Sequence, residues 1–198
     1  ADPIKSHVRQ YAFVRLLYKY GGMCLPNSTI VMEDVKPIMN MFLHDKDFFA
    51  VESISRNKSA DALKFIPDSD IMGARQGSDV LKQLIEYWQT LISKDNTAEM
   101  DFLGRFNIKL FELYNKNEIN VINSKLFGMK DRNGKEILLE DLLSSSPIQT
   151  STNCYCMVIP KKELLKRTKY NWFVRLNSHQ IMESDNNISN HLAFSLNQ

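Results

Sequence analysis

The chain has 198 residues, which is enough to bury a sizeable hydrophobic core in one domain. Hydrophobic residues make up 43% and charged residues 24%, as in ordinary globular proteins. The formal charge of +2 is too small to indicate a nucleic-acid partner, and no apolar run reaches the roughly 18 residues that a membrane-spanning helix needs.

The N-terminal part of the sequence predicts a helix followed by two short strands. Residues 4–20 contain neither glycine nor proline and are apolar on nearly every side, so we expect a mostly buried helix. Gly21 lies where a left-handed C-terminal cap is expected, and Gly22 adds freedom before the next strand. Strands are predicted over 23–25 and 29–32, separated by the polar step Pro26-Asn27-Ser28.

The rest of the chain alternates between strand and helix patterns. The predicted elements are a short helix from Pro37, strands over 48–54 and 71–74, helices over 80–92 (N-cap Ser78) and 98–114, a strand over 120–122, a tight turn over 131–134, an amphipathic stretch over 137–143, a strand over 154–159, a helix over 161–169, an extended segment over 172–174 and a capped helix from about 184. This alternation predicts a single α/β domain with a mixed sheet over residues 1–198.

The cysteine pattern indicates a reducing compartment. Three cysteines, Cys24, Cys154 and Cys156, do not form an even disulfide framework. Cys154 and Cys156 flank one residue of a predicted strand, so both point to the same face, and we expect structural burial there. We therefore expect the cytoplasm of a host cell or a virion as the location. The chain starts at Ala1 without a methionine, which leads us to expect a missing upstream part and leaves an upstream anchor open.

A family resemblance is carried by the stretch RLLYKYGGMCLPNSTIVMEDVKPI, residues 15–38. It resembles the sugar-binding region of glycosyltransferases with a GT-A-like fold, of the capsular-polysaccharide-synthesis type and its relatives in large DNA viruses. FIPDSDIMGARQGSDVLKQLIEYW (residues 65–88) and CYCMVIPKKELLKRTKYNWF (residues 154–173) are also similar to the family. The resemblance implies transfer of a hexose from a nucleotide sugar to a glycan or protein acceptor, with part of the fold upstream of Ala1.

The sequence departs from the family at the metal motif. The family places Asp-x-Asp, which holds Mg or Mn against the leaving diphosphate, where this chain has Pro26-Asn27-Ser28. Gln10 and Phe13 likewise occupy the places of a family Asp-x-x-Arg. Taken without the resemblance, the polar step is more simply explained as an ordinary surface turn, because Pro, Asn and Ser are turn residues.

Three interpretations follow for the donor site, which we place at the corner from Gly22 to Thr29. In the first, Gly21, Gly22, Asn27 and Ser28 bind the donor without metal while Arg9, Arg15 or Lys19 pairs with the diphosphate. In the second, displaced carboxylates hold the cation, and Asp68 and Asp70 are better placed for this than Asp45 and Asp47. In the third, the fold has lost catalysis and serves as a structural or interaction protein with assembly partners, for example in a virion.

Two further places are candidates for sugar or acceptor contacts. Gly73 and Ala74 belong to a small-residue turn that would let a ligand approach the backbone, although an ordinary strand-to-helix turn is the simpler explanation. Trp172 and Phe173 are candidates for an acceptor groove.

Overall fold

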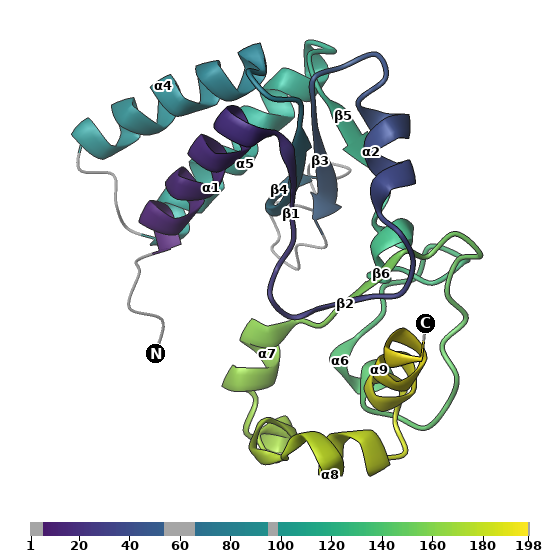
Figure 1. Cartoon of the computed structure of the whole chain (residues 1–198). Helices are drawn as coiled ribbons and strands as arrows, with labels where there is room; N and C mark the ends of the chain where they lie inside the picture. Colours follow the sequence, from purple (N-terminus) through teal and green to yellow (C-terminus); the bar gives the residue numbers. More distant parts are fainter. Residues whose placement is uncertain (1–5, 54–65, 95–98, 198) are drawn as a thin grey trace. The chain divides into compact units, whose positions relative to one another are not determined.

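The structure is a computed structural model that describes residues 6–53, 66–94 and 99–197 (Figure 1). It contains two compact units. Unit 1 comprises the described residues up to Leu25 and those from Lys36 to Asn123, and unit 2 comprises Pro26–Val35 and the described residues from Ser124 onward. The polar step Pro26-Asn27-Ser28 is therefore where the chain leaves unit 1 and enters unit 2. The expectation of a single domain stays a prediction.

Unit 1 is an α/β unit built on a four-stranded mixed sheet, which confirms the predicted fold class at this level. Its elements are α1 (Ser6–Tyr20), β1 (Gly22–Cys24), α2 (Lys36–Phe42), β3 (Phe48–Ser53), β4 (Ile66–Ala74), α4 (Asp79–Ser93), α5 (Glu99–Asn115) and β5 (Asn120–Ile122). The strand order is β1-β4-β3-β5. β4 is antiparallel to both β1 and β3, whereas β3 and β5 are parallel.

Helices cover both faces of this sheet, as the ribbon shows (Figure 1). Phe48 and Ala50 of β3 belong to the core that α1, α4 and α5 form on one face. Phe49 points to the opposite face and packs edge-on against Phe42 of α2, with ring centroids 6.3 Å apart. All four residues Phe48–Val51 are fully buried, because successive strand side chains alternate between two covered faces.

The end of α1 and the start of α4 are held by the same turn. Gly21 adopts φ +68, and its amide donates to the Leu17 carbonyl at 2.7 Å, which confirms the predicted left-handed cap. The Gly77 amide donates to the Tyr18 carbonyl at 2.9 Å. Ser78 caps α4 as predicted, since its Oγ accepts from the Leu81 amide.

The prediction of a mostly buried first helix is wrong. Val14 and Leu17 of α1 are buried, whereas Val8, Leu16 and Tyr20 are exposed. The helix packs on α4, α5 and the sheet with one face only, so apolar residues on the other face remain at the surface.

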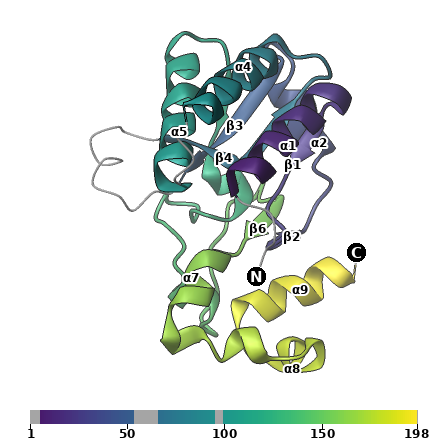
Figure 2. The ribbon, with the colours of Figure 1, turned by 90° about the vertical axis from the view of Figure 1, so that its left-hand side faces the viewer.

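Unit 2 is assembled around a two-stranded antiparallel sheet (Figure 2). Its elements are β2 (Thr29–Val31), η1 (Ser124–Phe127), α6 (Leu139–Leu142), β6 (Cys156–Val158), α7 (Lys161–Lys166), η2 (Thr168–Tyr170), η3 (Phe173–Arg175), α8 (Ser178–Glu183) and α9 (Asn187–Leu196), where η marks 3-10 helices. Ile30 of β2 lies opposite Met157 of β6, and the Ser195 Oγ of α9 donates to the Val31 carbonyl at 2.6 Å. The segment Pro26–Val35 thus supplies a strand to a unit whose other residues come about 100 positions later.

Two details of unit 2 differ from the sequence-based expectations. The prediction of an extended segment over 172–174 is wrong, because the 3-10 helix η3 forms there and Phe173 is buried. The final helix starts after Asn186, whose side chain accepts from the Ser189 amide, rather than near Ser184. Cys154 and Cys156 are free and buried as expected. In the described parts of the chain, no helix is both long and apolar enough to cross a bilayer.

Candidate functional site

The candidate site begins at one side of the unit 1 sheet, where strands β1, β3 and β5 end. We call this side the carboxyl edge. Because β1 and β3 both run antiparallel to β4, and β5 runs parallel to β3, the carboxyl ends of these three strands share one edge. The first residues of β4 lie at that same edge. In open α/β sheets, ligands bind beyond the carboxyl ends of the strands.

An irregularity in β4 lies close to this edge. Ala50 pairs with Met72, and the next residue, Val51, pairs with Asp68. Residues 69–71 therefore have no residue opposite them on β3. Ser69 and Ile71 are buried, while Asp70 between them is exposed. Bulges of this kind redirect a side chain and are frequent next to active sites.

Asp70 is joined to the helix layer by Gln10 of α1. The Gln10 Nε2 donates to Asp70 Oδ1 at 2.7 Å across 60 positions of sequence. Gln10 is only 6% exposed, and its Oε1 is buried without a hydrogen-bond partner. A buried acceptor left unsatisfied costs about 1–3 kcal/mol, so a hydroxyl or N–H group that came within reach of this oxygen would relieve that cost. Residue patterns alone did not single out this pair, because only the fold brings residues 10 and 70 together.

The structure separates the two predicted arginines. Arg9 is half-buried and adjoins Gln10 in α1. Arg15 is exposed and donates to the Tyr11 hydroxyl at 3.1 Å, which lowers the pKa of Tyr11. Since Gln89 of α4 also donates to that hydroxyl, Arg15 lies on the α4 side of the helix rather than beside Gln10.

The paired glycines have different surroundings. A Cβ at Gly21 would lie 2.9 Å from the Gln76 amide nitrogen, so close backbone packing explains this glycine. Gly22 adopts φ +106 and has open space where a Cβ would be. The donor-binding role assigned to both glycines stays a prediction.

Gly73 and Ala74 are both closely packed against other parts of unit 1. The Phe49 ring fills the space where a Cβ of Gly73 would be, and Ala74 is buried in the core. In the described residues, these contacts account for the small side chains. A ligand contact at either position stays a prediction.

Asn27 and Ser28 belong to unit 2, whereas the other predicted donor-site residues belong to unit 1. Asn27 is exposed. Ser28 is half-buried, and its Oγ donates to the Ile159 carbonyl at 2.9 Å, next to the β2–β6 pairing. The contacts of Ser28 within unit 2 are those of a residue that holds the strand pair, and a role in donor binding stays a prediction.

The predicted metal ligands are only partly described. The side chain of Asp68 lies outside the described residues, and Asp70 contacts Gln10. Asp45 accepts from Asn120, which lowers the pKa of Asp45, and Asp47 accepts from the Asp79 amide at the start of α4. Among the described residues, no three His, Cys, Asp or Glu side chains are grouped as a metal site would require. Mg or Mn binding stays a prediction.

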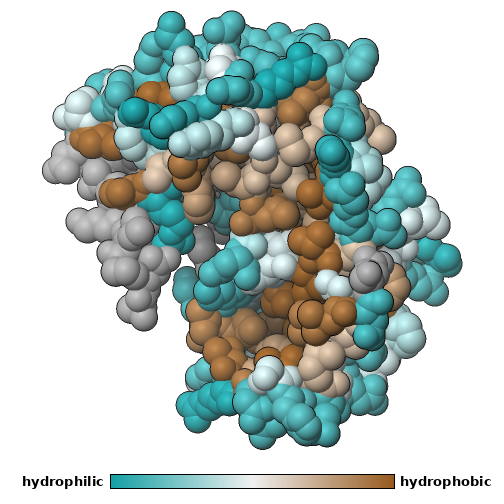
Figure 3. Space-filling model, viewed as in Figure 1, coloured by the Kyte–Doolittle hydropathy of each residue, from teal (hydrophilic) through white to brown (hydrophobic). Residues whose placement is uncertain are grey.

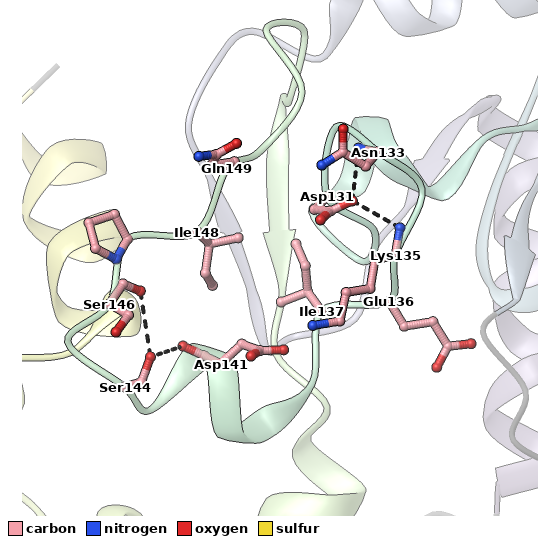
Figure 4. Close-up of a pocket in the computed structure, with 11 residues that line it drawn as sticks. Asp131, Asn133, Lys135, Glu136, Ile137, Asp141, Ser144, Ser146, Ile148 and Gln149 are labelled. Atoms are coloured by element: carbon pink, nitrogen blue, oxygen red, sulfur yellow. Dashed lines mark hydrogen bonds between the residues drawn. The ribbon is translucent and has the colours of Figure 1, made fainter.

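Unit 2 contains an open, polar hollow of about 290 Å³ that the sequence did not indicate (Figure 4). Asp131, Lys135, Glu136 and Asp141 are among the residues that line it. The Asp131 Oδ1 accepts from the Asn133 and Lys135 amides, and the Asp141 Oδ2 accepts from the Leu138 amide. Two of its carboxylates thus hold the local backbone, as aspartates do in turns and at helix starts.

Comparisons with protein-family models, with curated proteins and with solved structures find no match to this chain.

Proposed function

We propose that unit 1 binds a nucleotide sugar at the carboxyl edge of its sheet, and that the protein is a glycosyltransferase with a GT-A-like fold that transfers a hexose to a glycan or protein acceptor. The observation that carries this proposal is the buried Gln10, which contacts Asp70 through its amide nitrogen and leaves Oε1 without a partner. A hexose offers several hydroxyl groups, each of which can donate to such an oxygen.

The arrangement around this pair supports the proposal. Three parallel strands end at one edge, the β4 irregularity exposes Asp70 there, and α1 brings Arg9 to the position next to Gln10. An arginine suits a diphosphate because its guanidinium presents several donors in one plane. Asp68 and Asp70 are the proposed cation ligands if the donor requires Mg or Mn.

Calorimetric titration with a panel of UDP- and GDP-sugars, with and without Mn²⁺, tests the proposal. We expect binding of at least one donor, and we expect Gln10→Leu to weaken it by about fivefold to a hundredfold, the equivalent of about 1–3 kcal/mol. The matched control is Gln83→Leu, since Gln83 lies exposed on α4 and donates to Glu118.

The outcomes separate the alternatives. Heat that appears only with Mn²⁺ supports the carboxylates as cation ligands, and heat without metal supports Arg9 as the diphosphate partner. If the folded protein binds no donor in the panel, or if both leucine variants bind equally well, the site proposal is wrong. Absence of binding to every donor in the panel would favour a structural or interaction protein that has lost catalysis.

A further inference from the structure

Positive charge is concentrated in residues 161–175, which we call the basic segment. It comprises α7, η2 and η3 and contains six Lys or Arg residues against one Glu, a formal charge of +5. Because the whole chain carries +2, the remaining residues together carry −3. The net charge of the chain is therefore close to zero although one part of unit 2 is strongly basic.

Most of these cations are available to a partner. Arg167 is engaged, since it pairs with Glu140 at 2.6 Å and with Glu163 at 3.2 Å. Lys161, Lys166, Lys169 and Arg175 are exposed, and in the part of the chain that the structure describes no acidic side chain pairs with them.

Large apolar side chains are exposed between the cations. Leu165 is 50% exposed, Trp172 49% and Val174 43%. The space-filling view shows hydrophobic side chains at the surface of unit 2 over α7 (Figure 3). Exposed apolar groups flanked by Lys and Arg are typical of surfaces that enter the headgroup region of a bilayer.

Buried neighbours hold the segment in place. Leu164, Tyr170 and Phe173 alternate with the exposed residues and are part of the core of unit 2. The rings of Trp172 and Phe173 meet edge-on, with centroids 5.7 Å apart. The exposed side chains are therefore presented by a folded scaffold, which reduces the ordering cost of binding.

We propose that the basic segment binds the surface of a bilayer that contains anionic lipids, with Trp172, Leu165 and Val174 entering the interface and the lysines contacting the headgroups. Charge complementarity identifies anionic lipid, because each Lys or Arg near such a surface strengthens binding about fivefold. Leu165 and Val174 favour a bilayer over nucleic acid, since aliphatic side chains cannot stack on bases. This surface lies in unit 2 and does not depend on the proposed donor site.

Vesicle sedimentation combined with tryptophan fluorescence tests the inference on the full chain. The protein has two tryptophans, of which Trp88 is fully buried and Trp172 is exposed, so a change of emission reports on Trp172. With vesicles of phosphatidylcholine and phosphatidylserine we expect sedimentation and a blue shift, both weakened by salt. With phosphatidylcholine alone we expect at least about tenfold weaker binding.

Two pairs of charge reversals provide the control. Lys166→Glu with Lys169→Glu should reduce binding to the anionic vesicles at least about tenfold. Lys82→Glu with Lys94→Glu changes the net charge equally on exposed positions of unit 1 and should leave binding nearly unchanged. The inference is overturned if the protein binds neither vesicle type or both equally, if both double variants lose binding alike, if binding leaves Trp172 emission unchanged, or if single-stranded RNA binds at salt concentrations where the vesicles do not.

Discussion

The Gln10 Nε2 lies 2.7 Å from Asp70 Oδ1, joining the first helix to the irregular part of β4. Replacing this amide by a carboxyl, Gln10→Glu, would place two acidic groups in contact. Burial and the neighbouring Asp70 would both raise the pKa of the introduced carboxyl in the folded state above the ordinary glutamate value of about 4.3. A carboxyl with such a raised pKa does not lower the stability of the variant below the ordinary pKa, where it is protonated in both states. The variant loses stability as the pH rises through the folded-state pKa.

We therefore expect Gln10→Glu to be close to the wild type near pH 4 and less stable by about 1–2 kcal/mol at pH 7, measured by urea unfolding. Gln83→Glu is the matched control, because it creates an exposed acidic pair with Glu118 where solvent screens the repulsion. Mn²⁺ should restore stability selectively to Gln10→Glu if the edge holds a cation. A pH-independent loss in Gln10→Glu would contradict the expected carboxyl pair.

The close packing of Phe49 on Gly73 makes a second prediction. A methyl group at position 73 would overlap the Phe49 ring, which is itself fully buried, so Gly73→Ala should destabilise the protein by about 1–3 kcal/mol. Gly104→Ala is the control, since Gly104 lies within α5 with open space around it and alanine there should stabilise by about 0.5–1 kcal/mol. Thermal unfolding of both variants measures the contrast, and equal melting temperatures would refute it.

The paired thiols of unit 2 give a third prediction. Burial raises the pKa of Cys154 to about 11 and that of Cys156 to about 12, so neither forms the reactive thiolate near neutral pH. In the native protein at pH 8, both thiols should react with a thiol reagent far more slowly than in urea. Rapid labelling of both without unfolding would show that the segment opens readily.

The raised pKa values of Cys154 and Cys156 also imply that the protein loses stability at alkaline pH. Because the folded pKa values lie above the ordinary one, the contribution of these thiols to stability is complete below about pH 8.5 and declines as pH rises toward 11–12. The variant Cys154→Ala with Cys156→Ala should therefore lose less stability than the wild type between pH 9 and about 11. Parallel pH profiles would contradict this expectation.

Local patterns in the sequence were sufficient for most secondary structure. Ser78 followed by an apolar periodicity predicts α4, and Gly21 after an uninterrupted run predicts the end of α1; the structure confirms both. Such signals are carried by a few neighbouring residues, so they do not depend on the rest of the fold. The mixed α/β sheet was predicted from the alternation of these elements, while its GT-A identity stays a prediction.

What the sequence could not predict depends on contacts between distant residues. The Gln10–Asp70 pair exists only because β4 lies beside α1, and the burial of one face of α1 depends on which helices pack against it. Phe173 has an extended pattern but forms a 3-10 turn because the unit 2 core takes up its ring. The transfer of Pro26–Val35 into unit 2 likewise depends on pairing with β6.

A fifth prediction concerns Asn187, which joins the start of α9 to the chain that follows α6. Its Nδ2 group is shared between the carbonyl oxygens of Asp141, Ser144 and Ser146, at 2.8, 3.0 and 2.8 Å. The side chain is buried, so Asn187→Ala would remove three hydrogen bonds and leave these carbonyls only the Ser144 N–H and Oγ and the amide of residue 187 as donors. We expect this loss to destabilise unit 2 by about 1–3 kcal/mol. Asn187→Asp should cost more, because it directs a carboxylate at three carbonyl oxygens.

Asn190→Ala is the control for this prediction, since Asn190 lies exposed on the same helix and alanine favours the helix there. Urea unfolding followed by fluorescence can resolve the units, because Trp88 belongs to unit 1 and Trp172 to unit 2. In a Trp88→Phe background, the Trp172 transition should shift to lower urea for Asn187→Ala and remain in place for Asn190→Ala. Equal midpoints for the two variants would mean that the remaining donors satisfy the three carbonyls without the Asn187 side chain.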